Sequence, residues 1–164
     1  MTHHTIHQSA DERFNPVAGV LAYLLPGLGH WYLGEAKRGL LIGAGVLWLF
    51  FGAVLIGGID SVDRVEDKWW FVGQAGVGPI AFAADLVHQT QFKVVDSRGQ
   101  LQTPPPGPDA KASKSIGHAN EIGSLFGAIA GMLNIMCVID ALWRPRIDRR
   151  VRIRSASASD GAPA

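Results

Sequence analysis

The sequence predicts an all-α integral membrane protein with about four transmembrane helices. Residues 39–59 contain no charged side chain, and a helix of about 20 residues spans the roughly 30 Å hydrocarbon core of a bilayer. A water-exposed helix of that length needs a polar face, and this segment has none. Three further apolar blocks surround it, at residues 17–33, 69–87 and 122–142. Together the four blocks predict one compact membrane domain over residues 16–143.

The regions outside this domain are short and polar. The 164-residue chain leaves no room for a separate soluble enzyme domain. Residues 1–15 form a polar leader that lacks the cationic region of a secretory signal, so we expect an uncleaved N-terminus. Residues 144–164 are basic and then small and polar, which predicts a tail that ends in disorder. The single cysteine, Cys137, excludes an intrachain disulfide.

The first apolar block, residues 17–33, has a clear helix start. Asn15 is a suitable N-cap, and Pro16 suits the first helical position. Pro26 and Gly27 interrupt the second half of the block. A kinked crossing helix and a re-entrant segment both fit this pattern.

The remaining blocks are separated by polar loops. The second block, residues 39–59, is the clearest span, and an acidic loop over residues 60–68 follows it. The third block, residues 69–87, opens on aromatic residues, which favour the headgroup region. The long polar loop 88–121 contains a Pro-rich linker at 103–108, which we expect to be extended and exposed. The fourth block closes the membrane domain.

The distribution of Lys and Arg predicts the orientation. Four crossings place nine of these residues on the side of both termini and six on the other side. The positive-inside rule then predicts that both termini are cytoplasmic, in a plasma or inner membrane. A re-entrant first block changes the split to seven against eight, which favours neither orientation.

Small residues predict close helix packing. Glycines recur at strict four-residue spacing in the fourth block, and the second block has a weaker version of the pattern. Such a stripe lets two helix backbones approach closely in lipid, within the monomer or between copies of the chain. An amide on the same stripe needs a partner inside the protein. The packing candidates are Gly39, Gly43, Gly123, Gly127, Gly131 and Asn134.

Ionisable residues near the ends of the spans are the candidates for a metal or proton site. With four crossings, His30, Asp85 and His88 fall on one membrane face, where they could bind a divalent metal or relay protons. Their separations match no metal-site signature, so we predict no metal and no cofactor. Asp140 precedes Arg144 by four residues, which predicts an ion pair within one helix.

A run of arginines follows the last span. Its position against the membrane predicts a positive-inside signal and contact with anionic lipid headgroups. The same position explains the run without nucleic-acid binding, which we do not expect. These arginines are Arg144, Arg146, Arg149, Arg150, Arg152 and Arg154.

The segment between the first two blocks predicts a tight helical corner. Its glycines permit a sharp turn, and its two aromatic residues suit the headgroup level. The corner residues are Pro26, Gly27, Gly29, Trp31, Tyr32 and Gly34. With the charged pair that follows and the glycine-led second block, this segment resembles the TM-two type family of paired transmembrane helices. Trp31 stands where that family usually has Phe, and the Asp-Arg-Phe linker of its animal members is missing. The resemblance implies a small multi-pass membrane protein, and it transfers no catalytic residue.

The chain contains no phosphate-binding loop, nucleophile elbow or zinc-protease motif. Asn134 and Gln74 alone are too few for a polar path, and no inverted repeat is detectable in the sequence, so a carrier is not predicted. We therefore expect a non-catalytic structural or accessory protein that associates with itself or with other membrane proteins through its glycine-rich helix faces. A membrane-embedded enzyme or metal-binding protein that uses His30, Asp85 and His88 is the alternative.

Overall fold

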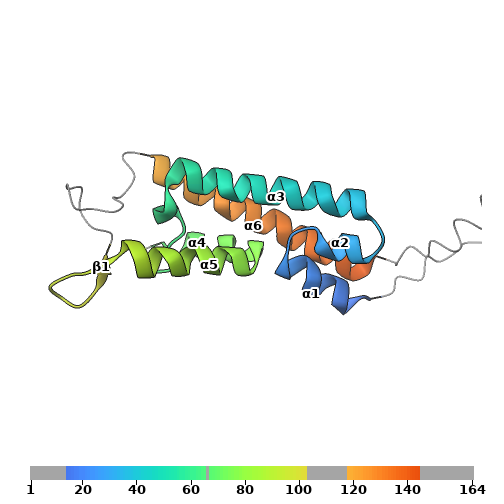
Figure 1. Cartoon of the computed structure of the whole chain (residues 1–164), viewed down its shortest axis with the longest axis horizontal. Coiled ribbons are helices and arrows are strands. Elements are labelled where there is room, and N and C mark those ends of the chain that lie inside the picture. Colours follow the sequence, from blue (N-terminus) through green and yellow to red (C-terminus); the bar gives the residue numbers. More distant parts are fainter. Residues whose placement is uncertain (1–13, 66, 103–117, 145–164) are drawn as a thin grey trace, which may run out of the picture.

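The computed structural model describes residues 14–65, 67–102 and 118–144. Two long helices, α3 (Ala36–Gly57) and α6 (Ala119–Trp143), lie side by side along the whole molecule (Figure 1). They run antiparallel, since Gly57 at the end of α3 packs against Gly123 near the start of α6. Within the described residues, these two helices are long and apolar enough to cross a membrane.

The first apolar block forms a helical hairpin. Helices α1 (Pro16–Leu24) and α2 (Leu28–Tyr32) are separated by a sharp turn at Gly27, whose φ of 85° is left-handed. At the start of the hairpin, the amide N–H of Asn15 donates to the carbonyl of Leu142 at 2.7 Å. The hairpin therefore begins and ends beside the C-terminal end of α6, because α2 returns toward the level from which α1 started.

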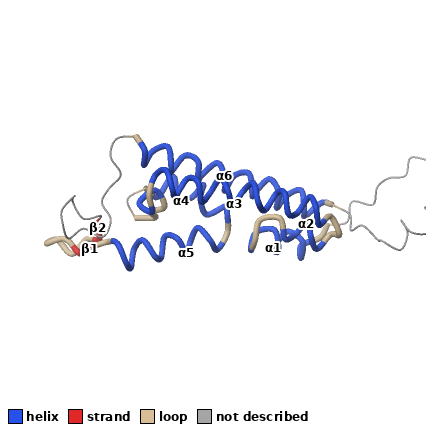
Figure 2. Tube along the Cα trace, turned by 45° about the horizontal axis from the view of Figure 1, so that its top comes forward, coloured by secondary structure: helices blue, strands red, loops and turns tan. Residues whose placement is uncertain are grey.

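The second hairpin enters from the opposite end of the molecule. A 3₁₀ turn, η1 (Ile59–Ser61), follows α3, and α4 (Lys68–Gln74) then runs along α6. A second 3₁₀ turn, η2 (Ala75–Val77), leads to α5 (Pro79–Val87), which runs back toward η1. Figure 2 shows this hairpin and the first one at opposite ends of the long helices.

The returning arm ends in a short irregular segment. A π-helical turn, η3 (His88–Phe92), extends α5. It is followed by β1 (Val94–Val95), which pairs antiparallel with β2 (Leu101–Gln102). These are the strands of the described part of the chain, and everything else of regular structure there is helical.

The tips of the two hairpins meet near the middle of the molecule. The hydroxyl of Tyr23 donates to the carbonyl of Ala75 at 3.2 Å. Gly78, with a φ of 99°, lies so close to the carbonyl of Tyr23 that a Cβ would overlap it. The side-chain amide of Asn134 on α6 donates to the carbonyl of Gly76 at 2.9 Å and to the carbonyl of Ala22 at 3.4 Å.

The chain is thus two units with the same order of elements and opposite direction. Each unit is a hairpin followed by a long helix, α1–α2–α3 and then α4–α5–α6 (Figures 1 and 2). The two hairpins enter from opposite ends, and the two long helices are antiparallel. The sequences of the two units share little beyond glycine and proline at the hairpin tips.

Of the four blocks expected to cross as single helices, two form long apolar helices, and four spans are not shown. The long helices match the expected spans 39–59 and 122–142 to within three residues. Residues 17–33 and 69–87 double back instead. Proline lacks an amide N–H, glycine adopts left-handed φ values, and each hairpin has both residue types at its tip. The Pro-rich linker, the leader up to residue 13 and the tail after residue 144 lie outside the described residues.

The interior combines mostly small apolar residues with polar ones, whereas the exterior carries large apolar side chains. The main buried cluster, around Phe50 and Phe71, consists mostly of valine and alanine. The largest exposed side chains include Trp48, Leu55 and Trp69, each more than four-fifths exposed. Among the described residues, twelve polar or charged ones are buried: His30, Asp60, Ser61, Asp63, Gln74, Asp85, His88, Gln89, Lys93, Asn120, Ser124 and Asn134. So many large exposed apolar side chains over so many buried polar groups are unusual in a water-soluble domain.

Candidate functional site

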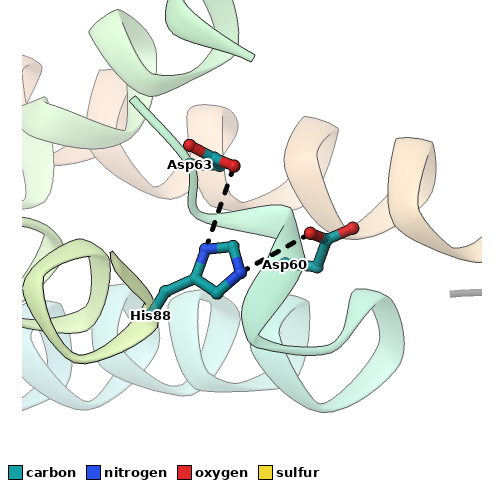
Figure 3. Close-up of side chains that lie close together, drawn as sticks. All are labelled: Asp60, Asp63 and His88. Carbon is teal, nitrogen blue, oxygen red and sulfur yellow. Dashed lines mark ion pairs between the residues drawn. The ribbon is translucent and has the colours of Figure 1, made fainter. Parts of the chain in front are cut away.

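Three buried side chains with metal-binding atoms converge between η1 and η3. The Nε2 atom of His88 lies 3.6 Å from Oδ1 of Asp60, and its Nδ1 atom lies 4.0 Å from Oδ2 of Asp63 (Figure 3). One ligand atom from each of the three residues lies within 4.8 Å of the others. All three residues are at most 5 % exposed.

Local backbone structure explains this convergence. Gly58, with a φ of 76°, ends α3, and the hydroxyl of Ser61 donates to the carbonyl of Gly58 at 2.7 Å. This turn brings Asp60 and Asp63 against the inner side of the second hairpin. The return of α5 then places His88 opposite both carboxylates (Figure 3).

A network of charges and amides holds the carboxylates. The ammonium group of Lys93 pairs with Oδ2 of Asp63. The side-chain amide of Gln89 donates to Oδ1 of Asp63 at 2.8 Å and to Oδ1 of Asp85 at 3.1 Å. Arg64 binds Asp85 twice, through its backbone N–H at 3.0 Å and its guanidinium at 3.2 Å. Lys93 and Arg64 are thus paired with Asp63 and Asp85, and Asp60 faces Nε2 of His88 at 3.6 Å.

This arrangement suits a cation or a proton. Carboxylate oxygens with an imidazole nitrogen are a common ligand set for divalent metals. Histidine also exchanges protons near neutral pH. Nδ1 of His88 is buried and has no hydrogen-bond partner among the described residues. The site therefore has an unused ligand atom that faces Asp63.

The structure does not bring His30 to this site. Asp85 and His88 do lie at the same end and share the network through Gln89. His30 is on α2 at the other end, where its Nε2 lies 2.8 Å from Oδ2 of Asp140. The predicted grouping of three assumed that residues 17–33 cross the membrane, and the hairpin removes that assumption.

His30 belongs to a second polar network. Asp140 also accepts hydrogen bonds from Arg38 at 3.1 Å and from Arg144 at 2.8 Å, which confirms the predicted pair with Arg144. Glu35 binds Arg144 at 3.1 Å. The hydrogen bond to Asp140, and then that to Glu35, raise the pKa of Arg144, which stays charged at every physiological pH. This network joins α2, α3 and α6.

The glycine stripes pack inside the chain. A Cβ at Gly123 would lie 2.6 Å from the Cα of Gly57, and one at Gly131 would overlap the carbonyl of Gly73. Gly127 faces the side chain of Gln74. On α3, Gly39 and Gly43 contact the backbone of the first hairpin at Gly27 and Pro26. The glycine stripes were predicted to pack within the monomer or between copies of the chain, and the structure shows packing within the monomer.

The predicted corner residues form the return arm of the first hairpin. Pro26 and Gly27 lie at its tip, and Gly29 packs against the backbone of Ala18. Trp31 is exposed, Tyr32 is half-buried, and Gly34 precedes α3 with a positive φ. Of the six arginines assigned to lipid contact, Arg144 lies in the Asp140 network. The remainder, Arg146, Arg149, Arg150, Arg152 and Arg154, lie outside the described residues.

Sequence reasoning missed Asp60, Asp63, Gln89 and Lys93. The first two are part of the acidic loop that follows the clearest span, and an acidic loop by itself is common on a surface. Only the return of α5 brings His88 and Lys93 to it. A useful signal was available in the sequence, since Gly78 and Pro79 interrupt the third block as Pro26 and Gly27 interrupt the first.

These features define a small helical protein with two long apolar helices packed side by side, two hairpins that lie against them at opposite ends, and a buried Asp–His cluster. Residues 17–152 match the family of unknown function DUF6677, and the chain belongs to this family. No curated protein and no solved structure matches the chain.

Proposed function

We propose that the chain is an integral membrane protein in which α3 and α6 cross the bilayer and the two hairpins re-enter from opposite sides. The apolar exterior over a polar interior supports this proposal. Only 28 % of the apolar window of α3 and 39 % of that of α6 is buried, whereas the core helix of a soluble protein is mostly buried. Lipid is the solvent that suits such a surface.

The hairpin tips also support this topology. Irregular backbone at membrane depth is tolerated where it is buried in protein. The tip carbonyls of Ala22, Ala75 and Gly76 accept hydrogen bonds from side chains of the chain itself. These three carbonyls therefore have hydrogen-bond partners within the chain.

The charge distribution fits this topology better than it fits four crossings. Lys37 and Arg38 now lie on the side of both termini together with Arg13 and the six C-terminal arginines. The split is again nine against six, and no adjacent basic pair opposes it. The proposed orientation has both termini in the cytoplasm, in a plasma or inner membrane.

Within this membrane protein we assign a non-catalytic structural or accessory role. One observation carries the assignment: the glycines and most buried polar side chains are used to hold the fold together. Association with other membrane proteins must then use outer apolar faces, such as that of α3 around Trp48 and Leu55. The resemblance of residues 17–59 to the TM-two type supports a small multi-pass protein without a reaction of its own.

Site-specific photo-crosslinking in native membranes tests this role. A crosslinker at Trp48, which is exposed, should give one discrete protein adduct. The matched control is Val46 two residues away on α3, which is buried and should give none. Adducts with lipid alone at Trp48, and at Leu55 further along the same helix, would contradict an accessory role.

A second candidate function is the passage of a small polar solute. The meeting of two interrupted segments from opposite ends favours it, because inverted transporters place their sites at such a junction. The side-chain oxygens of Gln74 and Asn134 are buried there without hydrogen-bond partners among the described residues. Liposomes that contain the protein should then show solute flux that is lost in Gln74→Met, and the absence of flux for ions and small polar solutes would exclude this candidate.

A further inference from the structure

We propose that Asp60, Asp63 and His88 bind a divalent transition-metal ion, a property that goes beyond the structural role. Ligand oxygens and nitrogens lie about 2.0–2.2 Å from such an ion, so opposite ligands of one ion are separated by about 4.4 Å. The three ligand atoms here lie within 4.8 Å of one another. His88 presents Nε2 to Asp60 and Nδ1 to Asp63, so coordination of one ion by all three residues requires rotation of the His88 ring or of the Asp60 side chain.

The burial and chemistry of His88 point to a metal rather than to a simple salt bridge. Its side chain is 1 % exposed, and Nδ1 makes no hydrogen bond to any described residue. Burial of an imidazole nitrogen without a partner costs free energy, and a metal ion would supply that partner. Imidazole with two carboxylates favours zinc, manganese, iron or cobalt over calcium or magnesium, which prefer oxygen ligands alone.

The surrounding residues orient the ligands. Gln89 holds Oδ1 of Asp63 at 2.8 Å, and the backbone N–H of Val65 donates to the same oxygen at 2.7 Å. Oδ2 of Asp63 is left facing His88 and Lys93. Such secondary contacts fix the orientation of a ligating carboxylate.

Lys93 competes with the metal ion for the carboxylate of Asp63. Its ammonium occupies Oδ2 of Asp63, the oxygen that faces His88. A divalent ion must displace this ammonium, and both positive charges cannot remain close together in a buried site. Removal of the ammonium should therefore tighten metal binding, whereas removal of a ligand should abolish it.

Cobalt titration of the full chain in detergent tests the site directly. After treatment with a chelator, the protein should bind Co²⁺ with one-to-one stoichiometry, give visible d–d absorption, and release the ion to Zn²⁺. Lys93→Met should lower the dissociation constant at least tenfold. His88→Ala and Asp60→Asn should each abolish the absorption, and far-UV circular dichroism should verify their folds.

The matched control is His118→Ala. His118 lies near the same end of the bundle at the start of α6, but it is exposed and pairs with Glu121. This variant should bind Co²⁺ as the wild type does. Loss of binding in His118→Ala with retention in His88→Ala would overturn the proposal, and so would the absence of saturable binding in both the wild type and Lys93→Met. Absence of saturable binding in both proteins would mean that Asp60, Asp63 and His88 form only an internal ion-pair network.

Discussion

His30 and Asp140 are 110 residues apart in the sequence, yet their side chains lie 2.8 Å apart. This contact ties the return arm of the first hairpin to the C-terminal end of α6. It exists only because residues 17–33 double back. The pair is therefore a direct marker of the hairpin topology.

Replacement of Asp140 by alanine should destabilise the protein by about 1.5–3 kcal/mol, because hydrogen bonds to a charged group are lost and His30 is left buried without them. Thermal unfolding in detergent, followed by circular dichroism, measures the change. Glu121→Ala is the control, since Glu121 binds only the exposed His118 in the described structure. Equal stability of the two variants would mean that the His30–Asp140 contact does not hold the hairpin.

Gly131→Ala should cost about 1–3 kcal/mol or prevent folding, because the added methyl group overlaps the carbonyl of Gly73. Gly45→Ala on α3 is the matched control, since a Cβ there meets no atom within 4 Å. It should be neutral or stabilising by up to about 1 kcal/mol, owing to the higher helix propensity of alanine. Chemical unfolding of both variants decides the point, and similar losses would argue against close packing of α4 on α6.

Cysteine accessibility in intact cells should separate two crossings from four. In a Cys137→Ser background, single cysteines at Lys37 and Ser97 should be labelled from opposite sides of the membrane. Four crossings would place these two positions on the same side. A cysteine at Arg64 should be labelled from the side of Ser97, because the second hairpin begins and ends there. Labelling of Arg64 and Ser97 from opposite sides would refute the re-entrant second hairpin.

Asn134→Leu should loosen the junction of the hairpins. The amide donates to both tips, so its loss leaves the carbonyls of Ala22 and Gly76 without this donor in a buried position. We expect a loss of about 1–3 kcal/mol and faster proteolysis near residues 74–78. Met132→Leu, at an exposed position on the same helix, should change neither quantity. Proteolysis at the wild-type rate in Asn134→Leu would show that the tips do not depend on this amide.

The two long helices could be predicted from the sequence because length and apolarity suffice for them. Residues 39–59 and 122–142 lack the breaks that would allow another structure. The hairpins could not be predicted with the same ease, since a block of 17–19 apolar residues fits one tilted helix as well as two short ones. Pro26 and Gly27 are compatible with a kinked helix and with a hairpin. Gly78 and Pro79 form the equivalent break in the third block, which was expected to be one helix.

The Asp–His cluster depends on that same break. Asp60 and His88 are separated by a complete hairpin, and no spacing rule joins residues across a turn whose existence is unknown. His30 illustrates the reverse case, because a wrong topology placed it beside Asp85 and His88. Contacts between distant elements follow from the path of the chain rather than from residue type.

The contact between the hairpin tips makes the two faces of the bundle mechanically dependent. Helix α5 is a stiff rod about 13 Å long that joins His88 at one end to Gly78 at the other. Gly78 lies against the carbonyl of Tyr23 without space for even a methyl group. Movement of α5 along its axis toward this contact would therefore press on the first hairpin, and in the proposed topology a displacement on one side of the bilayer would be transmitted toward the other.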